Sequence, residues 1–106
     1  MGKVEYVYFL STEQTDRLRV RFYKDKKIIL QFVVQYEILL RDEWKAVVRY
    51  DTSHGFAHRD LMHPDGSVDK LPLPTLTYAV ALMYATQDLK QSWRWYRQRY
   101  EEEENQ

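Results

Sequence analysis

The residues best suited to chemistry are gathered in one stretch of the chain, between Tyr50 and Gly66. This stretch holds all three histidines of the 106-residue sequence, His54, His58 and His63, together with three aspartates. Histidine has the side-chain pKa nearest neutrality, so two histidines can act as base and acid in one catalytic cycle. We therefore predict that any active site of this protein lies in this stretch.

Cleavage of RNA by attack of its own 2′-hydroxyl is a reaction that suits these residue types. It requires a base for the 2′ proton, an acid for the 5′ leaving oxygen and a cation for the charge that develops on phosphorus. We predict that His54 and His58 are the acid–base pair and that Arg59 is the phosphate-stabilising cation. The predicted orienting carboxylates are Asp51 and Asp60.

Two neighbouring residues extend this predicted site. Tyr50 is expected to stack on a base or to bond a phosphate, and Arg49 is a second candidate cation. On a strand, His58 and Asp60 would share one face and Arg59 would lie on the other. The function predicted from these residues is a metal-independent ribonuclease that needs no cofactor.

The same residues leave two alternatives open. A metal-dependent hydrolase would need His54 and His58 to converge with a nearby aspartate by folding, although no known ligand spacing is matched. The stretch could also be a polar corner that catalyses nothing, because structural ion pairs gather the same groups. We expect His63, in a predicted hairpin turn, to be structural.

A second feature is a series of arginines beside this stretch. The segment from residue 17 to 23 alternates strictly between polar and apolar residues, which is the period of a half-buried strand. The residues predicted to form a nucleic-acid-binding face are Arg17, Arg19, Arg21, Lys45 and Arg49. The alternatives are a merely solubilising face, or a non-enzymatic module that binds nucleic acid or a partner protein through it.

The elements that must position these residues are short β-prone segments joined by connections too short for crossover helices. The predicted strands are residues 17–23, 28–40, 44–51, 56–63 and 68–71, with 4–10 as an edge strand or an ordered lead-in. Pro64-Asp65-Gly66-Ser67 is a turn signal, because Asp-Gly supplies the positive φ angles of hairpin turns. These features predict an antiparallel meander.

One long helix is predicted from Thr75, its expected cap, to about Glu103. Apolar residues recur there at spacings of three and four, at Tyr78, Leu82, Ala85, Leu89, Trp93, Tyr96 and Tyr100. A second apolar stripe early in the helix predicts that its first half is buried on most sides. Exposed aromatic residues in its second half would form a patch that soluble monomers usually avoid, at Trp93, Trp95, Tyr96 and Tyr100. We therefore expect a homodimer through the helix, or a surface for a partner protein.

The predicted fold class is α+β, an antiparallel β-meander of four to five strands packed against one long C-terminal helix. We expect a single domain over residues 1–106, with the sheet at about 4–71, a connector at 72–74 and the helix at about 75–103. The absence of cysteine excludes disulfides and thiolate catalysis. Because no long apolar run follows Met1, we expect a cytoplasmic protein without a membrane segment.

The stretch from Arg49 to Gly66, R-Y-D-T-S-H-G-F-A-H-R-D-L-M-H-P-D-G, resembles a group of small prokaryotic proteins that are in turn similar to TumE-type toxins of toxin–antitoxin pairs. The matching positions are Tyr50, Asp51, Gly55, His58 and Arg59. The chain departs from the TumE pattern at Thr52, where Asn is usual, and at residues 57–60, where Asp-His-Arg-His is usual. The resemblance implies a small toxin that acts on RNA and is neutralised by a DNA-binding antitoxin.

Overall fold

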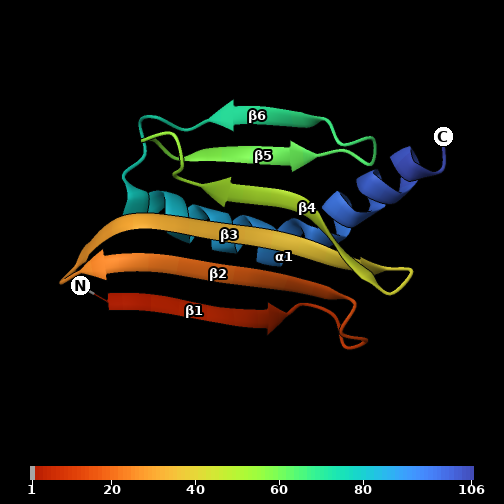
Figure 1. Cartoon of the computed structure of the whole chain (residues 1–106), viewed down its shortest axis with the longest axis horizontal. Helices are drawn as coiled ribbons and strands as arrows, with labels where there is room; N and C mark the ends of the chain where they lie inside the picture. Colours follow the sequence, from red (N-terminus) through yellow and green to blue (C-terminus); the bar gives the residue numbers. More distant parts are fainter. Residues whose placement is uncertain (1) are drawn as a thin grey trace.

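The computed structural model describes residues 2–106 and has one antiparallel sheet covered on one face by one helix (Figure 1). The strands follow each other in chain order across the sheet: β1 (Gly2–Phe9), β2 (Asp16–Asp25), β3 (Ile28–Leu40), β4 (Glu43–Asp51), β5 (His58–Met62) and β6 (Val68–Pro72). The helix is α1 (Tyr78–Glu104). The predicted α+β meander is confirmed, with six strands because the predicted lead-in is a full strand, β1, paired along its length with β2.

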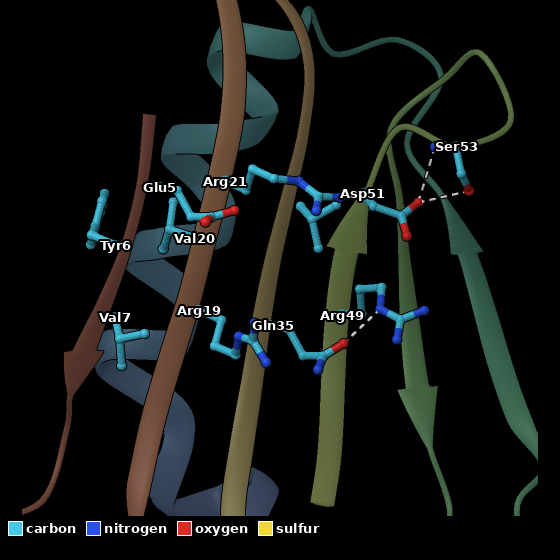
Figure 2. Close-up of a pocket in the computed structure, with 11 residues that line it drawn as sticks. Glu5, Tyr6, Val7, Arg19, Val20, Arg21, Gln35, Arg49, Asp51 and Ser53 are labelled. Atoms are coloured by element: carbon cyan, nitrogen blue, oxygen red, sulfur yellow. Dashed lines mark hydrogen bonds between the residues drawn. The ribbon is translucent and has the colours of Figure 1, made fainter. Parts of the chain in front are cut away.

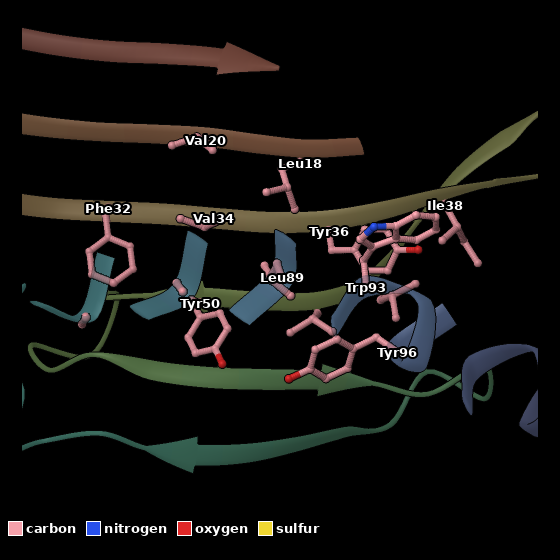
Figure 3. Packing of buried hydrophobic residues seen from close by; sticks show 14 of the residues in the cluster. Leu18, Val20, Phe32, Val34, Tyr36, Ile38, Tyr50, Leu89, Trp93 and Tyr96 are labelled. Atoms are coloured by element: carbon pink, nitrogen blue, oxygen red, sulfur yellow. The ribbon is translucent and has the colours of Figure 1, made fainter. Parts of the chain in front are cut away.

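The core lies between the middle of the sheet and α1, which packs on β3 and β4. Alternate residues of the central strands point to the helix, as the period of two requires. Figure 3 shows Leu18, Val34 and Tyr36 of the sheet against Leu89 and Trp93 of the helix. The opposite face of the sheet has no covering element among the described residues, and we call it the open face. The site must be sought there, since the helix face is filled by the core.

The helix begins three residues later than predicted. Thr77 is its cap, and its side chain accepts a hydrogen bond from the backbone nitrogen of Val80. The second apolar stripe is not buried, because Val80, Met83 and Tyr84 are about half exposed. The prediction that the first half of the helix is buried on most sides is therefore wrong: one stripe suffices to cover two strands.

The aromatic residues of the second half of α1 are mostly used within the chain. Trp93, Tyr96 and Tyr100 are buried against the chain's own sheet, and only Trp95 stays largely open, at 60% exposure. The patch expected to form a homodimer is thus reduced to a single large side chain, although the dimer itself stays a prediction. Among residues 2–106, no helix is both long and apolar enough to cross a bilayer.

A β-bulge in β4 changes which residues face the helix. Tyr36 pairs with Val48 whereas Glu37 pairs with Ala46, so Val47 is an extra residue in β4. The extra residue reverses the alternation in the first half of the strand. Lys45 therefore pairs with the buried Ile38 on the helix side, away from the arginines that it was predicted to join.

Candidate functional site: an Asp–His–Asp cluster beside an arginine groove

The pairing of β4 with β5 brings three chemically capable side chains together on the open face. Asp51 is opposite His58, and Arg49 is opposite Asp60. Because every second residue of a strand points to the same face, Asp51, His58 and Asp60 are neighbours. The predicted association of one histidine with both aspartates is thus present, and the turn between the two strands is what creates it.

The three side chains form a buried cluster, which we call the Asp–His–Asp cluster. His58 is only 2% exposed, and its Nε2 lies 2.9 Å from Oδ1 of Asp51 and 3.5 Å from Oδ1 of Asp60. Neither oxygen is placed where a ring N–H could donate to it, so Nε2 has no hydrogen-bond partner within residues 2–106. One potential ligand atom from each residue lies within 4.8 Å of the others.

Further contacts hold the two carboxylates from outside. Oδ1 of Asp51 accepts hydrogen bonds from the backbone nitrogen and the hydroxyl of Ser53, at 3.1 and 3.0 Å. Lys70 of β6 donates to both carboxylate oxygens of Asp60, at 3.1 and 3.3 Å. The Lys70 side chain is itself 54% exposed, so a surface cation caps one side of a buried anionic cluster.

His54 lies in the turn that joins β4 to β5 and is exposed. Gly55 allows this turn, with a φ of 83° that side chains other than glycine rarely adopt. The turn is anchored by Thr52, whose hydroxyl accepts a hydrogen bond from the backbone nitrogen of Phe32 at 3.1 Å. The ring centroids of His54 and His58 are 5.2 Å apart. The predicted histidine pair is therefore adjacent, but only His54 faces solvent.

Tyr50 and Arg59 are not part of this cluster, because they pair with each other across β4 and β5 and point to the helix. The Tyr50 hydroxyl donates to Oδ2 of Asp88 at 2.8 Å, and Nη1 of Arg59 donates to the Tyr96 hydroxyl at 3.4 Å. Burial and the hydrogen bond to Asp88 raise the pKa of Tyr96 to about 12. The predicted roles of Tyr50 in binding a base or phosphate, and of Arg59 as the phosphate-stabilising cation, thus do not agree with the positions of these residues.

A groove of about 610 Å³ crosses the open face and ends at Asp51 (Figure 2). Its cationic lining residues are Arg19 and Arg21 of β2 and Arg49 of β4. Arg49 donates from Nε to the side-chain oxygen of Gln35 at 2.7 Å, and Figure 2 shows Arg21 extended toward Asp51. Arg21 and Arg49 make no salt bridge within residues 2–106, so both charges are available to a ligand. Three of the five predicted nucleic-acid-binding residues therefore line one groove.

The other two predicted binding residues are engaged elsewhere. Nε of Arg17 binds Glu37 at 2.7 Å, and the Arg17 guanidinium lies over the ring of Trp44 at 3.8 Å. Lys45 pairs with Glu43 at 2.9 Å on the helix side. Burial and the charge of Glu104 raise the pKa of Tyr100, and Lys45 lies close enough to oppose that shift.

His63 has the structural environment that was predicted for it. Its Nδ1 lies 2.7 Å from Glu103 of α1 and its Nε2 lies 2.8 Å from Asp69 of β6. The adjoining turn is closed by Ser67, which donates to Asp65, and by Gly66 at a φ of 91°. This histidine ties the hairpin to the helix.

Sequence reasoning missed three residues at the site, namely Gln35, Ser53 and Lys70. Lys70 could have been found, because it lies four residues beyond the glycine of the hairpin turn and pairs with Asp60 when that turn sets the register. Gln35 could have been found from the alternation of β3, which places it beside Arg49. Ser53 carries no such signal, since its contact depends on the local shape of a turn.

Comparison with known proteins gives one match. A family model described as a domain of unknown function (DUF7718) matches residues 1–106. Neither the curated proteins nor the solved structures contain a match. The resemblance to TumE-type toxins therefore stays a prediction.

Proposed function

We propose that this chain, which belongs to the family described as a domain of unknown function (DUF7718), binds RNA on its open face and cleaves it as a toxin-like ribonuclease. One observation carries the proposal. The arginine groove reaches Asp51 and Ser53. His54, the only histidine of the pair that faces solvent, follows them in the same turn, with its ring 5.2 Å from that of His58. A phosphodiester lying in the groove would thus have cations along it and proton-transferring groups at its end.

Binding would rest on the charges of the groove. The side chain of Arg19 is 60% exposed. Arg21 and Arg49 make no salt bridge within residues 2–106, although Glu5 is opposite Arg21 and Asp60 is opposite Arg49 in the sheet. Guanidinium groups present a planar set of donors that matches phosphate oxygens. Glu5 also lines the groove and Glu37 lies 3.9 Å from Arg19, so the surface attracts phosphate locally rather than through net charge.

Cleavage in the absence of metal would use His54 and Asp51. The 2′ oxygen forms a bond to phosphorus while the bond from phosphorus to the 5′ oxygen breaks. Asp51 takes the 2′ proton and His54 donates a proton to the 5′ oxygen, which leaves a 2′,3′-cyclic phosphate and a 5′-hydroxyl. Arg49 or Arg21 stabilises the charge on phosphorus in place of Arg59. Ser53 holds Asp51 in place by donating two hydrogen bonds to its Oδ1, at 3.1 and 3.0 Å.

The test is cleavage of single-stranded RNA by the purified full chain in EDTA. We expect His54→Ala to lower the cleavage rate by about 100-fold or more, which is the usual effect of losing an acid–base group. His63→Gln is the control, because this histidine lies away from the groove, on the other face of the sheet, where it contacts Asp69 and Glu103. Intact RNA with the wild-type chain, or an undiminished rate with His54→Ala, would contradict the ribonuclease proposal.

The second candidate function is an interaction module that binds RNA through the same groove and cleaves nothing. The burial of His58 favours it, since a second histidine is not accessible to substrate. RNA that is bound but left intact would favour this function over cleavage.

An antitoxin partner and a homodimer through α1 remain part of the toxin-like proposal. Light scattering of the chain alone and with its antitoxin would test them.

A further inference from the structure

We propose that the Asp–His–Asp cluster of Asp51, His58 and Asp60 is a binding site for one divalent first-row metal ion, such as Mn²⁺ or Zn²⁺. Metal binding would be a property in addition to RNA binding. It depends only on the three ligand side chains and not on whether RNA binds. The argument rests on the unpaired ring nitrogen, the spacing of the ligand atoms and the balance of charge around them.

The first argument is the state of His58. Its Nε2 is buried, has no hydrogen-bond partner within residues 2–106, and lies 2.9 and 3.5 Å from two carboxylate oxygens. A buried polar atom without a partner is destabilising, and a water or an ion beside it is one physical explanation of such an atom in a native protein. A metal ion would take the Nε2 lone pair and both carboxylates at once.

The second argument is spacing. Ligand atoms bound to one ion at about 2.1 Å lie about 3.0 to 3.4 Å apart when they are adjacent in tetrahedral or octahedral coordination. Nε2 of His58 lies 2.9 and 3.5 Å from its two neighbouring carboxylate oxygens, and the three ligand atoms lie within 4.8 Å of one another. Small side-chain rotations would therefore be enough to close the cluster around an ion.

The third argument is charge. Asp51 and Asp60 bring two carboxylates into a buried position, and the cation that contacts them from the surface, Lys70, reaches only Asp60. Asp51 is held by the neutral donors of Ser53. One imidazole with two carboxylates is a ligand set that suits Mn²⁺ and Zn²⁺, which accept both nitrogen and oxygen donors. A bound ion would also make the end of the arginine groove more attractive to a phosphate.

The cluster around His63 provides an internal contrast. It too contains one histidine and two carboxylates, Asp69 and Glu103. Each carboxylate there contacts a different ring nitrogen, and the two nitrogens of an imidazole point away from each other. The three groups cannot converge on one ion. Of these two clusters, the one on the open face has the geometry of a chelate.

The experiment is a calorimetric titration of the metal-stripped full chain with MnCl₂ and, separately, with ZnCl₂. It measures the affinity and the number of ions bound, and no RNA is present. We expect one equivalent to bind, and His58→Gln and Asp51→Asn each to weaken binding by about tenfold or more. His63→Gln should bind as the wild type does. The site does not exist if the wild-type chain takes up no metal at about 1 mM, or if His63→Gln weakens binding as much as His58→Gln.

Two further measurements cover the case in which these variants do not fold. In the wild-type chain, paramagnetic Mn²⁺ should broaden the imidazole resonances of His58 before those of His63, and the reverse order would overturn the assignment. Lys70→Gln should bind metal about two- to fivefold more tightly, because the ammonium competes for Asp60. Weaker binding by this variant would mean that Lys70 belongs to a metal-free ion-pair cluster. RNA is absent from all of these measurements. A chain that binds no metal would therefore contradict the metal site without contradicting the ribonuclease proposal, which the cleavage assay in EDTA tests separately.

Discussion

At the scale of single residues, Asp16 joins the sheet to the helix. It is buried at the start of β2, accepts a hydrogen bond from the Tyr36 hydroxyl at 2.5 Å, and accepts two from Nη1 of Arg97 at 2.9 and 2.8 Å. Removal of Arg97 would leave a buried carboxylate without its counter-charge. We expect Arg97→Met to lower the free energy of unfolding by about 3 kcal/mol, measured by urea denaturation.

The control for this prediction is Arg94→Met on the same helix. Arg94 lies over the ring of Trp93 and makes no salt bridge within residues 2–106, so its loss should lower stability by less than about 1 kcal/mol. Equal losses for the two variants would show that the pair between Arg97 and Asp16 adds nothing beyond the packing of an arginine stem.

His63 should give the protein a pH-dependent stability. Its hydrogen bonds to Asp69 and Glu103 raise its pKa above the ordinary value of 6.5. The folded state therefore holds the proton more tightly than the unfolded chain does. The resulting stabilisation is complete below the unfolded pKa and is lost as the pH rises through the folded pKa.

The corresponding variant is His63→Gln. We expect it to lower the free energy of unfolding more at about pH 5.5 than at about pH 9, as measured by urea denaturation at both values. The pKa of His63 itself can be followed by the chemical shifts of its ring. A loss of stability that is the same at both pH values would mean that the two carboxylates hold a neutral imidazole.

The sequence could place some site residues on faces but could not bring them together. Alternation along residues 58–62 was sufficient to put His58 and Asp60 on one face and Arg59 on the other, and this is confirmed. Two outcomes depended on neighbouring strands. Asp51 joins the cluster through the register of β4 with β5, and His58, which lies between β4 and β6, is buried on the open face.

At the scale of elements, the turn between β3 and β4 is the least favourable backbone in the sheet. Leu40 pairs with Glu43, so Arg41 and Asp42 form a two-residue loop, with φ angles of 49° and 64°. Such loops favour Asn-Gly because both residues adopt a left-handed conformation, which costs about 1 kcal/mol or more for other residues.

The test of this turn is Asp42→Gly. We expect it to raise the free energy of unfolding by about 1 kcal/mol. Within residues 2–106 the Asp42 side chain makes no hydrogen bond or salt bridge that the change would remove, and glycine adopts the positive φ freely. Thermal and urea denaturation would measure the gain. Val47, at the bulge in the following strand, should be unaffected in its pairing, and a changed register seen by NMR would contradict the prediction.

The same elements show why some boundaries and faces were mispredicted. The bulge at Val47 inserts one residue into β4, and no turn residue or glycine marks it, so Lys45 was placed with the arginines of the open face. The predicted start of the helix is Thr75, whereas the cap is Thr77. Residues 73–76 first close a turn, in which the backbone nitrogen of Leu76 donates to the backbone oxygen of Leu73. Periodicity identifies an element more reliably than it identifies the residue at which an element begins or reverses its faces.

At the scale of the whole molecule, the meander separates two kinds of surface. One face of the sheet is closed by α1 and holds the core, whereas the other is left open and carries the groove and the cluster. Short connections between the strands made this topology predictable, because no crossover could intervene. The extent of the sheet was less predictable. β1 is exposed along most of its length, and an exposed edge strand lacks the alternating pattern that reveals a buried one.

This division of faces predicts how RNA binding should depend on salt. If Arg19, Arg21 and Arg49 each contact one phosphate of single-stranded RNA, the logarithm of the association constant should fall with the logarithm of salt concentration with a slope of about −2. Arg21→Gln should weaken binding and bring the slope closer to zero by about 0.7, because one contact is lost. Lys45→Gln, which removes an equal charge from the helix side, should leave the slope unchanged. Fluorescence anisotropy over a series of salt concentrations measures all three chains. A slope that shifts equally in the two variants would mean that RNA responds to total charge and that the groove on the open face is not its binding site.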